Sequence, residues 1–593
     1  MRVAIVAPPY PLEEAPAPPL GVCYVAAAFE AAGARVKIID YIVSRYTPEK
    51  LEAELDAFQP DVLGSTSVTL NFPQAATIVQ KAKQLRPSLV TLMGGPHVSF
   101  DAARTLARYP GIDLLVLGEG EETIREWVPH LHDPGAWPGI LGLAYRQDGR
   151  VVTTGTRGFI QDLDSLPLPS RHLLECSRYQ ALGFPVSIIT GRGCPYPCIF
   201  CQGRRMVGSR VRYRDPKRIV DEIEEILGYG FDRINVADDL FCSRKDRARA
   251  VCREILDRGI RVPWSAFARV NTEDREMLEI MREAGCDSVS FGIESGNPAM
   301  LERIRKRITL DQARQAVKLC RETGILAHAS FMVGLPGETM ETLRETEAFA
   351  QSLGIIYGYH FLAPFPGTTV REKIHEYDLE ILTDDWSRYD ANRAIVRTSA
   401  LSAEDMEAFY EEYDQRNRHY WAKLEKQYRE EAVIPEEDFF RVYGRHRMEL
   451  TFRILSEDLV ETLGDFPLDA VRGRQGVGPA AGPDTAQRLP PDAHPGRADG
   501  TNPGGGGNEV RSEPWNPGGG VDEALLARAE ALLAERIRDV TGAEDKLVRQ
   551  AVGDFARKGF IKATETNGRL RWYWTHNRRR DFDPASPTRL RVA

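Results

Sequence analysis

Three cysteines lie close together in the chain, in the spacing Cys194-x-x-x-Cys198-x-x-Cys201. Three thiolates on one short loop can bind three irons of a 4Fe-4S cluster, whereas a cluster that only carries electrons normally uses four protein cysteines. The fourth iron is then open for a further ligand. A zinc site or a group of buried thiols is the competing interpretation, but zinc usually needs a fourth Cys or His, often in a second close pair. No such pair lies near this loop, so the motif predicts a catalytic iron–sulfur centre.

The length and composition limit what kind of protein this is. The chain has 593 residues, a formal net charge of −9, 42% hydrophobic residues and 27% charged residues. It is too long for one hydrophobic core and predicts about three to five folding units. The charge balance gives no general attraction to nucleic acid or to an anionic membrane. No apolar run is long enough for a membrane span, and the first residues are typical of a strand, so a cytoplasmic location is expected.

Residues 1–150 alternate between short apolar runs and amphipathic segments of ten or more residues. Strand-like runs cover residues 3–7, 36–40, 61–66, 89–93 and 114–117. Such alternation favours βα units and a parallel sheet with helices on both faces, that is, an open doubly wound domain. Ligands of these domains bind beyond the carboxyl ends of the strands.

Small and hydroxyl residues gather at that expected edge. Glycine allows the backbone to approach a ligand closely, and Ser and Thr hydroxyls form hydrogen bonds without bulk. His97 is more simply explained as a loop residue that donates a hydrogen bond. The candidate binding residues are Ser67, Thr69, Gly94, Gly95, Gly118, Glu119 and Gly120.

A connector at residues 151–180 leads to a second βα segment at residues 181–395. Strand-like runs are expected at 186–190, 233–237, 264–270, 288–293, 327–333 and 356–361, with helices between them. Thr309 and Gln312 form a capping box for a helix that Gly324 ends. The chemistry of such barrels gathers at the carboxyl ends of the strands. The cysteine loop follows the first of these runs.

These features resemble the radical S-adenosylmethionine enzymes, and the resemblance covers about residues 1–370. It rests on the cysteine motif with Phe200, on the order of the segments after it, and on Pro18-Pro19-Leu20-Gly21, Gly94-Gly95-Pro96-His97 and Gly118-Glu119-Gly120-Glu121, which are similar to the family's cobalamin-binding domain. It implies three cofactors: a 4Fe-4S cluster, S-adenosyl-L-methionine and cobalamin. The Asp-x-His-x-x-Gly motif of methionine-synthase-like domains is missing from residues 1–150, so we expect no histidine below the cobalt.

The resemblance also assigns roles to single residues. It implies that Phe200 lies near the adenine, and that Asp238 contacts the methionine amino group. Arg269 would bind the methionine carboxylate, for which a guanidinium has the right geometry. Glu294 and Ser295 would contact the ribose. Asp238 is equally explained as part of a structural turn.

The last third of the chain is less informative. Residues 396–470 are predicted to form a helical extension, and residues 471–521 are Gly/Pro-rich and are expected to be a disordered linker. Residues 522–583 resemble a winged helix, with Asn567-Gly568 at the hairpin turn. Arg569, Arg571 and Arg578 to Arg580 could meet phosphates, but a protein-binding module or a solvated basic tail explains them equally well, and we do not infer nucleic-acid binding.

The predicted fold is therefore α/β: a doubly wound cobalamin-binding domain, a partial (β/α)6 radical S-adenosylmethionine barrel, a helical extension and a small C-terminal module. The resemblance implies an enzyme, most simply a methyltransferase that methylates an unactivated carbon of a small molecule through a 5′-deoxyadenosyl radical and methylcobalamin. A non-methylating oxidative cyclase of the tetrapyrrole type is the alternative, and a cobalamin-responsive DNA-binding regulator is a more distant one. The implied partners are a small-molecule substrate and an external electron donor such as flavodoxin or ferredoxin.

Overall fold

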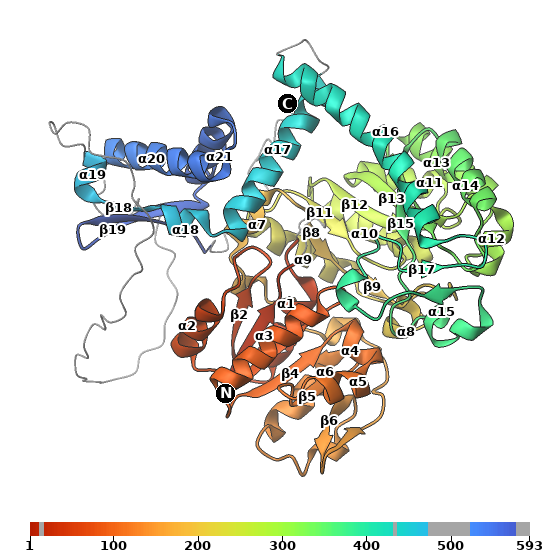
Figure 1. Ribbon diagram of the computed structural model, residues 1–593, viewed down its shortest axis with the longest axis horizontal. Helices are drawn as coiled ribbons and strands as arrows, with labels where there is room; N and C mark the ends of the chain where they lie inside the picture. Colours follow the sequence, from red (N-terminus) through yellow and green to blue (C-terminus); the bar gives the residue numbers. More distant parts are fainter. Residues whose placement is uncertain (11–16, 431–435, 473–521, 577–593) are drawn as a thin grey trace. The chain divides into compact units, whose positions relative to one another are not determined.

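The computed structural model describes residues 1–10, 17–430, 436–472 and 522–576 (Figure 1). The chain divides into two compact units, one made of Met1–Leu459 with Trp574–Ala593 and the other of Val460–Tyr573. Most of the expected linker and the basic residues Arg578 to Arg580 lie outside the described residues. The described helices include none that is long and apolar enough to cross a membrane.

The N-terminal domain is built on a sheet with the strand order β2-β1-β3-β4-β5-β6-β7. Strands β1 to β5 are parallel, and β6 and β7 extend the sheet as antiparallel strands, which the sequence did not predict. Its elements are β1 (Arg2–Ala7), α1 (Leu20–Ala31), β2 (Arg35–Asp40), α2 (Pro48–Phe58), β3 (Val62–Thr66), α3 (Phe72–Leu85), β4 (Val90–Gly94), α4 (Pro96–Phe100), α5 (Ala102–Arg108), β5 (Leu114–Val116), α6 (Gly120–Trp127), β6 (Leu143–Gln147) and β7 (Arg150–Thr153).

This strand order confirms the doubly wound prediction. Successive residues of β1, from Val3 to Ala7, are all buried, as expected for a strand covered on both faces. The chain moves to one side of β1 to form β2 and to the other side to form β3, so the strand order reverses there. Such a reversal opens a crevice at the carboxyl ends of the strands, where ligands of doubly wound sheets bind.

The second domain is a parallel sheet with the order β15-β14-β13-β12-β11-β8. All six predicted strands are present, and β8 and β15 lie at the two edges, so this is a partial (β/α)6 barrel. Its elements are α7 (Cys176–Leu182), β8 (Val186–Ile188), β9 (Gly191–Arg192), α8 (Gly203–Val207), β10 (Arg212–Tyr213), α9 (Pro216–Gly228), β11 (Ile234–Val236), α10 (Lys245–Asp257), β12 (Trp264–Ala268), α11 (Arg275–Glu283), β13 (Cys286–Glu294), α12 (Pro298–Arg303), α13 (Leu310–Thr323), β14 (Leu326–Val333), α14 (Met340–Ser352) and β15 (Ile356–Phe361).

Local signals in the sequence set the ends of the barrel helices. Helix α13 begins at the predicted capping box of Thr309 and Gln312, and it ends at Gly324, whose φ is 75°. A left-handed residue at this position is strained for any side chain larger than glycine. After the barrel come α15 (Thr369–Glu372), β16 (Glu380–Ile381), β17 (Val396–Arg397), α16 (Ala403–Arg429), α17 (Glu436–Ser456) and α18 (Leu459–Leu463).

The smaller unit contains the predicted helix, helix and hairpin. Its elements are β18 (Asp465–Pro467), α19 (Leu468–Arg472), α20 (Glu523–Thr541), α21 (Asp545–Arg557), β19 (Ile561–Thr566) and β20 (Arg569–Trp574). Strand β18 pairs with β20 and completes a sheet of order β18-β20-β19. The unit begins at Val460, so residues 460–470, which were expected to belong to the helical extension, lie in it, and β18 is part of its sheet.

Candidate functional site

The cysteine loop follows β8 and is held at its base by Asp238. The carboxylate accepts hydrogen bonds from the backbone N–H groups of Thr190 at 2.6 Å and Gly191 at 3.2 Å, and from the Thr190 hydroxyl. Arg247 donates to the same hydroxyl at 2.7 Å. Asp238 is buried and its partners are all in the chain, so in this structure it shapes the start of the loop rather than facing an open space.

Gly193 makes the turn into the first cysteine. Its φ is +119°, and a Cβ at this position would lie 2.4 Å from the carbonyl oxygen of Arg210. The close approach lets the Cys194 N–H donate to the Gly208 carbonyl at 3.0 Å. Only glycine fits a backbone that combines this conformation with this contact. The first cysteine is thereby fixed against the segment that leads into β10.

The three thiols differ in their surroundings. The Gly203 N–H donates to the Cys201 Sγ at 3.3 Å, and the Arg269 Nη1 lies 3.9 Å from the Cys198 Sγ. Burial raises the pKa of the Cys194 thiol, and it raises that of Cys201 to about 11. Iron binding needs thiolates, so the nearby N–H and guanidinium groups help by favouring the deprotonated sulfur.

The donor set fits a cluster better than a single metal ion. Within the described part of the chain, no three His, Cys, Asp or Glu side chains are arranged around a common point as ligands of one ion. In a cubane each cysteine binds a different iron, so the sulfurs need not converge on one point. Three thiols on one loop, with no fourth protein ligand grouped with them in the part of the chain that the structure describes, would leave one iron of a 4Fe-4S cluster open.

Arg269 lies between the cysteine loop and the segment after α12. Its guanidinium carbon is 3.6 Å from the centroid of the Tyr196 ring, and Nη2 donates to the Lys306 carbonyl. The side chain is buried although it is charged. A guanidinium that is buried, stacked on a ring and bonded to a carbonyl is held in one orientation beside the cysteine loop.

Glu294 ends β13 in an unusual conformation, with φ at 75° next to an irregularity in the strand register. Its Oε1 accepts a hydrogen bond from Lys306 Nζ at 2.6 Å. The carboxylate folds back over Gly292, where a Cβ would lie 2.5 Å from Glu294 Oε1. Gly292 therefore makes room for the pair. A non-glycine residue in the left-handed region is strained, and such strain is common at binding sites.

Lys306 is a site residue that the sequence did not reveal. Its ammonium lies 5.9 Å from the centroid of the Phe200 ring, as well as in contact with Glu294. The structure thus brings together Phe200, Arg269 and Glu294 from the predicted set, and adds Lys306 to them. In the sequence Lys306 stands in a run of basic residues that is typical of a solvated loop.

Ser295 does not join this group in the structure. Its hydroxyl lies 3.1 Å from the Thr346 Oγ1 and accepts a hydrogen bond from the Asn297 N–H at 3.1 Å. It is completely buried. Ser295 ties the end of β13 to α14 and starts the turn before α12.

The other candidate residues lie at the carboxyl edge of the N-terminal sheet. The Ser67 N–H donates to the Gly94 carbonyl at 3.3 Å, and Gly118 N–H donates to Ser99 Oγ at 3.0 Å. Gly95 has a φ of +97°, and a Cβ there would lie 2.6 Å from both the Ser67 carbonyl and the Thr66 hydroxyl. Only glycine therefore fits at this point of the edge, where the backbone packs closely against Thr66 and Ser67.

Buried polar atoms at this edge lack partners among the described residues. They include the Ser67 hydroxyl and the Asn71 Oδ1. Unpaired buried polar groups are costly, and they are usually satisfied by a bound molecule or by water. Cobalamin carries amide side chains that can donate to such oxygens and accept from such hydroxyls, so the edge fits this cofactor.

His97 was expected to be a loop residue that donates a hydrogen bond, but it lies in a short helix, α4. It is completely buried and stacks on Phe72 with ring centroids 3.9 Å apart. Its Nδ1 is 3.3 Å from the Thr69 hydroxyl, and its ring meets Trp386 edge-on at 5.1 Å. Burial lowers the pKa of His97 to about 3, so the imidazole is neutral. His97 joins the N-terminal domain to the segment after the barrel.

Glu119 uses its carboxylate to contact the barrel. Arg212 donates to it in a bidentate manner at 2.7 and 2.9 Å, and Arg192 donates at 3.2 Å. The Ile160 N–H donates at 2.8 Å, and Arg192 also pairs with Glu121 at 2.7 Å. The Glu119 side chain therefore connects the N-terminal domain to the antiparallel pair of strands β9 and β10.

The edge of the N-terminal sheet and the cysteine loop come close together through the loop after β15. A Cβ on Gly367 would lie 2.3 Å from the Phe100 ring of α4, so only glycine fits there. The carbonyl of the adjacent Pro366 accepts a hydrogen bond from Gln202 Nε2 at 2.6 Å. Gln202 directly follows Cys201. The two predicted cofactor sites are thus linked through a few residues.

Comparison with known proteins agrees with this architecture. Residues 14–128 match the B12 binding domain model, and residues 188–350 match the Radical SAM superfamily model. The chain is 36% identical over 392 residues to an uncharacterised methyltransferase of Pyrococcus horikoshii, which covers 66% of this chain and 85% of that protein. It is 29% identical over 399 residues to the anaerobic magnesium-protoporphyrin IX monomethyl ester cyclase of Rubrivivax gelatinosus, covering 65% and 70% of the two chains.

A solved structure shares the fold. The cobalamin-dependent S-adenosylmethionine radical enzyme OxsB, with aqua-cobalamin and S-adenosylmethionine bound, superposes with a TM-score of 0.62 at 17% identity, covering 94% of this chain and 84% of that one. The fold and the three-cysteine loop define an enzyme of the radical S-adenosylmethionine type with a B12-binding domain. The chain belongs to this family of cobalamin-dependent radical S-adenosylmethionine enzymes.

Proposed function

We propose that this enzyme methylates an unactivated carbon of a small molecule, using a 4Fe-4S cluster, S-adenosyl-L-methionine and cobalamin. The observation that carries the proposal is the short link from Phe100 at the cobalamin edge, through Gly367 and Pro366, to Gln202 beside the cysteine loop. A reaction that passes a methyl group to a substrate radical needs its two cofactors on either side of one small space.

When bound, the cluster supplies the electron that cleaves the sulfonium C–S bond of S-adenosylmethionine, and cobalamin carries the methyl group. Cys194, Cys198 and Cys201 would hold the cluster. The backbone around Gly95 and the Ser67 hydroxyl would bind cobalamin. Asp238 and Gly193 keep the cysteine loop in shape through their hydrogen bonds and close contacts.

The charged group beside the loop suits the methionine end and the ribose of S-adenosylmethionine. Arg269 and Lys306 supply two positive charges for a carboxylate, and Arg269 is held rigid by Tyr196. Glu294 can accept from the ribose hydroxyls, and its Oε1 lies 2.6 Å from the Lys306 ammonium, which holds the carboxylate in place. Phe200 supplies a ring face near Lys306 for the adenine. Asp238 and Ser295 would act on this site through the backbone that they hold.

Binding of S-adenosylmethionine tests the role of Lys306. Lys306→Met should weaken the Kd by at least about tenfold, since one ion pair with a carboxylate in a partly buried site is lost. Lys318→Met is the matched control, because Lys318 is exposed on the outer helix α13. Equal affinities of the two variants for S-adenosylmethionine would remove Lys306 from the site.

A second candidate function is an oxidative cyclisation without methyl transfer. It is supported by the similarity to the magnesium-protoporphyrin cyclase of Rubrivivax gelatinosus, which is 29% identical over 70% of that protein. Both functions use the same cofactors, so the cysteine loop alone does not distinguish them. They differ in whether cobalamin receives a methyl group.

The test uses S-adenosylmethionine with a trideuterated methyl group. The anaerobically reconstituted enzyme, with cobalamin reduced to the cob(I)alamin state, is expected to form S-adenosylhomocysteine and trideuterated methylcobalamin. This half-reaction needs no carbon substrate, so it can be measured without identifying one. Mass spectrometry detects both products. Formation of 5′-deoxyadenosine without S-adenosylhomocysteine or labelled cobalamin would favour the cyclase and would reject the methyltransferase.

A further inference from the structure

Two arginines on either side of Lys306 project in the opposite direction from it. Arg305 and Arg307 are exposed, whereas Lys306 between them is buried against Glu294. Both arginines have a φ of 56°, a left-handed conformation that is rare and costly for residues with side chains. Successive turns of the backbone therefore send one cation into the site and two cations to the surface. The exposure of the two arginines follows from the same backbone that builds the site.

This segment packs directly against the cysteine loop. The carbonyl oxygen of Arg305 lies 3.9 Å from the Cys198 Sγ, and the next carbonyl, that of Lys306, accepts from Arg269. The Ile199 N–H also donates to the Ile304 carbonyl at 3.2 Å. The main chain of an exposed residue, Arg305, thus contacts a cysteine that would bind the cluster, and Cys201 of the same loop is itself exposed. Electrons that reach the cluster from outside have a short path here.

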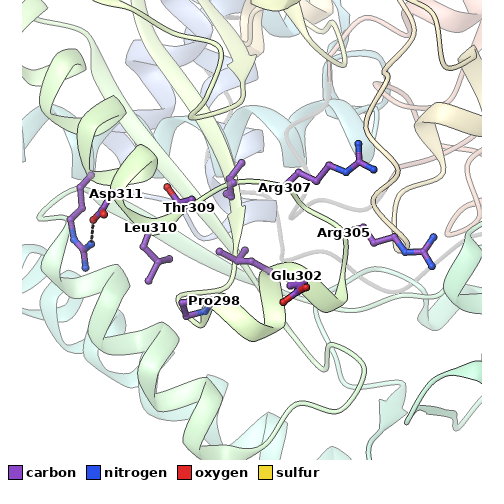
Figure 2. Close-up of a pocket in the computed structure, with 10 residues that line it drawn as sticks. Pro298, Glu302, Arg305, Arg307, Thr309, Leu310 and Asp311 are labelled. Carbon is purple, nitrogen blue, oxygen red and sulfur yellow. Dashed lines mark hydrogen bonds and ion pairs between the residues drawn. The ribbon is translucent and has the colours of Figure 1, made fainter.

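A groove lies directly beside the two arginines (Figure 2). It has a volume of about 690 Å³, with Pro298, Leu301, Ile308 and Leu310 among its lining residues. In Figure 2 the side chains of Arg305 and Arg307 extend from one end of it, away from Pro298 and Leu310. The groove thus combines apolar residues with a basic end next to the cluster loop.

The two arginines have no ion pair with any residue in the parts of the chain that the structure describes. Other surface arginines nearby do have such partners: Arg314 pairs with Asp311 at 2.8 Å at the far side of the groove, and Arg205 pairs with Glu372. Arg305 is close enough to act on the Glu376 carboxylate, but neither arginine is held in an ion pair within the described residues, so both side chains can reorient towards a partner. Uncompensated charges on a surface raise the rate at which an oppositely charged protein arrives.

We propose that Arg305, Arg307 and the adjoining groove form the docking surface for a small acidic one-electron carrier protein. The proposal rests on the proposed function, since it presumes a cluster on the cysteine loop. In the step that docking serves, the reduced carrier loses one electron and the oxidised cluster gains it, and no bond or proton is exchanged. Redox encounters of this kind use small, charged and short-lived interfaces.

Binding is measured first, with flavodoxin as the carrier and no turnover. Biolayer interferometry compares the wild-type enzyme, Arg305→Glu/Arg307→Glu, and the control Arg253→Glu/Arg261→Glu. The control reverses the charge of two exposed arginines, one on α10 and one just before β12. Arg261 lies at the amino end of a barrel strand, whereas the cysteine loop follows the carboxyl end of one, so the control leaves the surface beside the loop unchanged. We expect the first variant to bind at least about tenfold more weakly and to lose much of its dependence on salt. The control should bind as the wild type does.

The reductant then separates the two proposals. With flavodoxin as donor, cleavage of S-adenosylmethionine should fall at least about tenfold in Arg305→Glu/Arg307→Glu, whereas with dithionite, which needs no docking, it should stay at the wild-type rate. Arg305→Gln/Arg307→Gln should give an intermediate loss. Failure of every protein with dithionite would reject the proposed function itself. The docking surface would be overturned if Arg305→Glu/Arg307→Glu bound flavodoxin and reacted with it as the wild type does, or if the control lost as much. Dimerisation of the enzyme alone that is lost in Arg305→Glu/Arg307→Glu would also overturn it, because a second copy would then occupy the groove.

Discussion

The carboxylate of Glu119 at the start of α6 accepts two hydrogen bonds from the Arg212 guanidinium of β10, at 2.7 and 2.9 Å. Both side chains are buried, and Arg192 of the paired strand β9 joins them. The pair crosses from the N-terminal domain to the barrel. A residue that the family resemblance suggested for cofactor binding thus forms a buried charged contact between the domains.

Loss of this charge should loosen the two domains. Glu119→Gln leaves two buried guanidinium groups without full compensation, and breaking a buried pair in this way typically costs about 3–5 kcal/mol. We expect a lower melting temperature and faster proteolysis in the connector. Glu380→Gln breaks a surface pair with Arg397 in which both side chains are more than half exposed, so it should change stability by less than about 1 kcal/mol. Equal melting temperatures for the two variants would contradict this role of Glu119.

The cysteine loop predicts which thiols hold iron. Cys198→Ala should reduce iron and sulfide content after anaerobic reconstitution and abolish 5′-deoxyadenosine formation, because two remaining ligands hold a cluster poorly. Cys320→Ala is the control, since Cys320 is completely buried in α13 and far from the motif in sequence. A Cys198→Ala protein that still forms 5′-deoxyadenosine would reject the cluster assignment.

Gly95 predicts a specific defect in cobalamin binding. In Gly95→Ala the new methyl group would meet the Ser67 carbonyl and the Thr66 hydroxyl at 2.6 Å, so the binding edge must shift. We expect the Kd for hydroxocobalamin, measured by absorbance titration, to rise at least about tenfold, with cluster content unchanged. Gly139→Ala has no heavy atom within 4 Å of the new group and serves as the control. Wild-type affinity in Gly95→Ala would place cobalamin elsewhere.

Glu338 predicts a loss of stability as the pH rises from about 4.5 to about 8. It is fully buried, accepts from the Gly334 N–H at 2.6 Å and the Leu335 N–H at 3.1 Å, and burial raises its pKa to about 8. The unfolded carboxyl ionises near pH 4.5, so the free energy of unfolding falls as the pH rises from about 4.5 to about 8, by at most about 1.4 kcal/mol per pH unit. Glu338→Gln resembles the protonated acid and should lose this decline. Melting temperatures from pH 5.5 to 8 measure it, and parallel curves for the two proteins would contradict it.

His97 predicts the opposite pH dependence. Its pKa in the folded protein is about 3, against 6.5 for a free imidazole, because burial disfavours the charged ring. The unfolded chain therefore binds a proton below pH 6.5 that the folded chain excludes, and stability falls as the pH falls from about 6.5 towards 3. Above pH 7, His97→Leu should have a lower free energy of unfolding than the wild type by an amount that does not depend on pH. This difference should become smaller on acidification, because only the wild type loses stability there through His97. A gap that widens below pH 6 would show that the native imidazole is protonated.

The six barrel strands could be predicted because each is an apolar run between amphipathic helices of ordinary length. The cysteine loop and the position of Arg269 followed from the same rhythm, since residues after parallel strands meet at one edge. The three-residue strand β18 was missed because so short a run has no periodicity, and it pairs with a strand about a hundred residues away.

Lys306 could not be predicted for a different reason. Its burial depends on the left-handed backbone of Arg305 and Arg307, and nothing in the side chains of a basic run encodes that conformation. Asp238 and Ser295 lie at the predicted strand ends, but whether such a side chain turns towards a ligand or towards its own backbone depends on the tertiary packing. His97 is likewise buried by residues from separate elements, among them Phe72 and Trp386, and Trp386 is far away in sequence.

The paired strands β9 and β10 limit which domains of this enzyme can be exchanged, in evolution or by engineering. Cys194 comes two residues after Arg192, and Gly193 is pressed against Arg210, so the first iron ligand and the charged contacts to Glu119 belong to one stretch of backbone. A barrel grafted onto a different cobalamin domain would keep two buried cations and lose their counter-charges. Exchange of either half is therefore expected to require transfer of the matching acidic loop. The acidic loop of the N-terminal domain and the segment of β9 and β10 should accordingly change together in evolution.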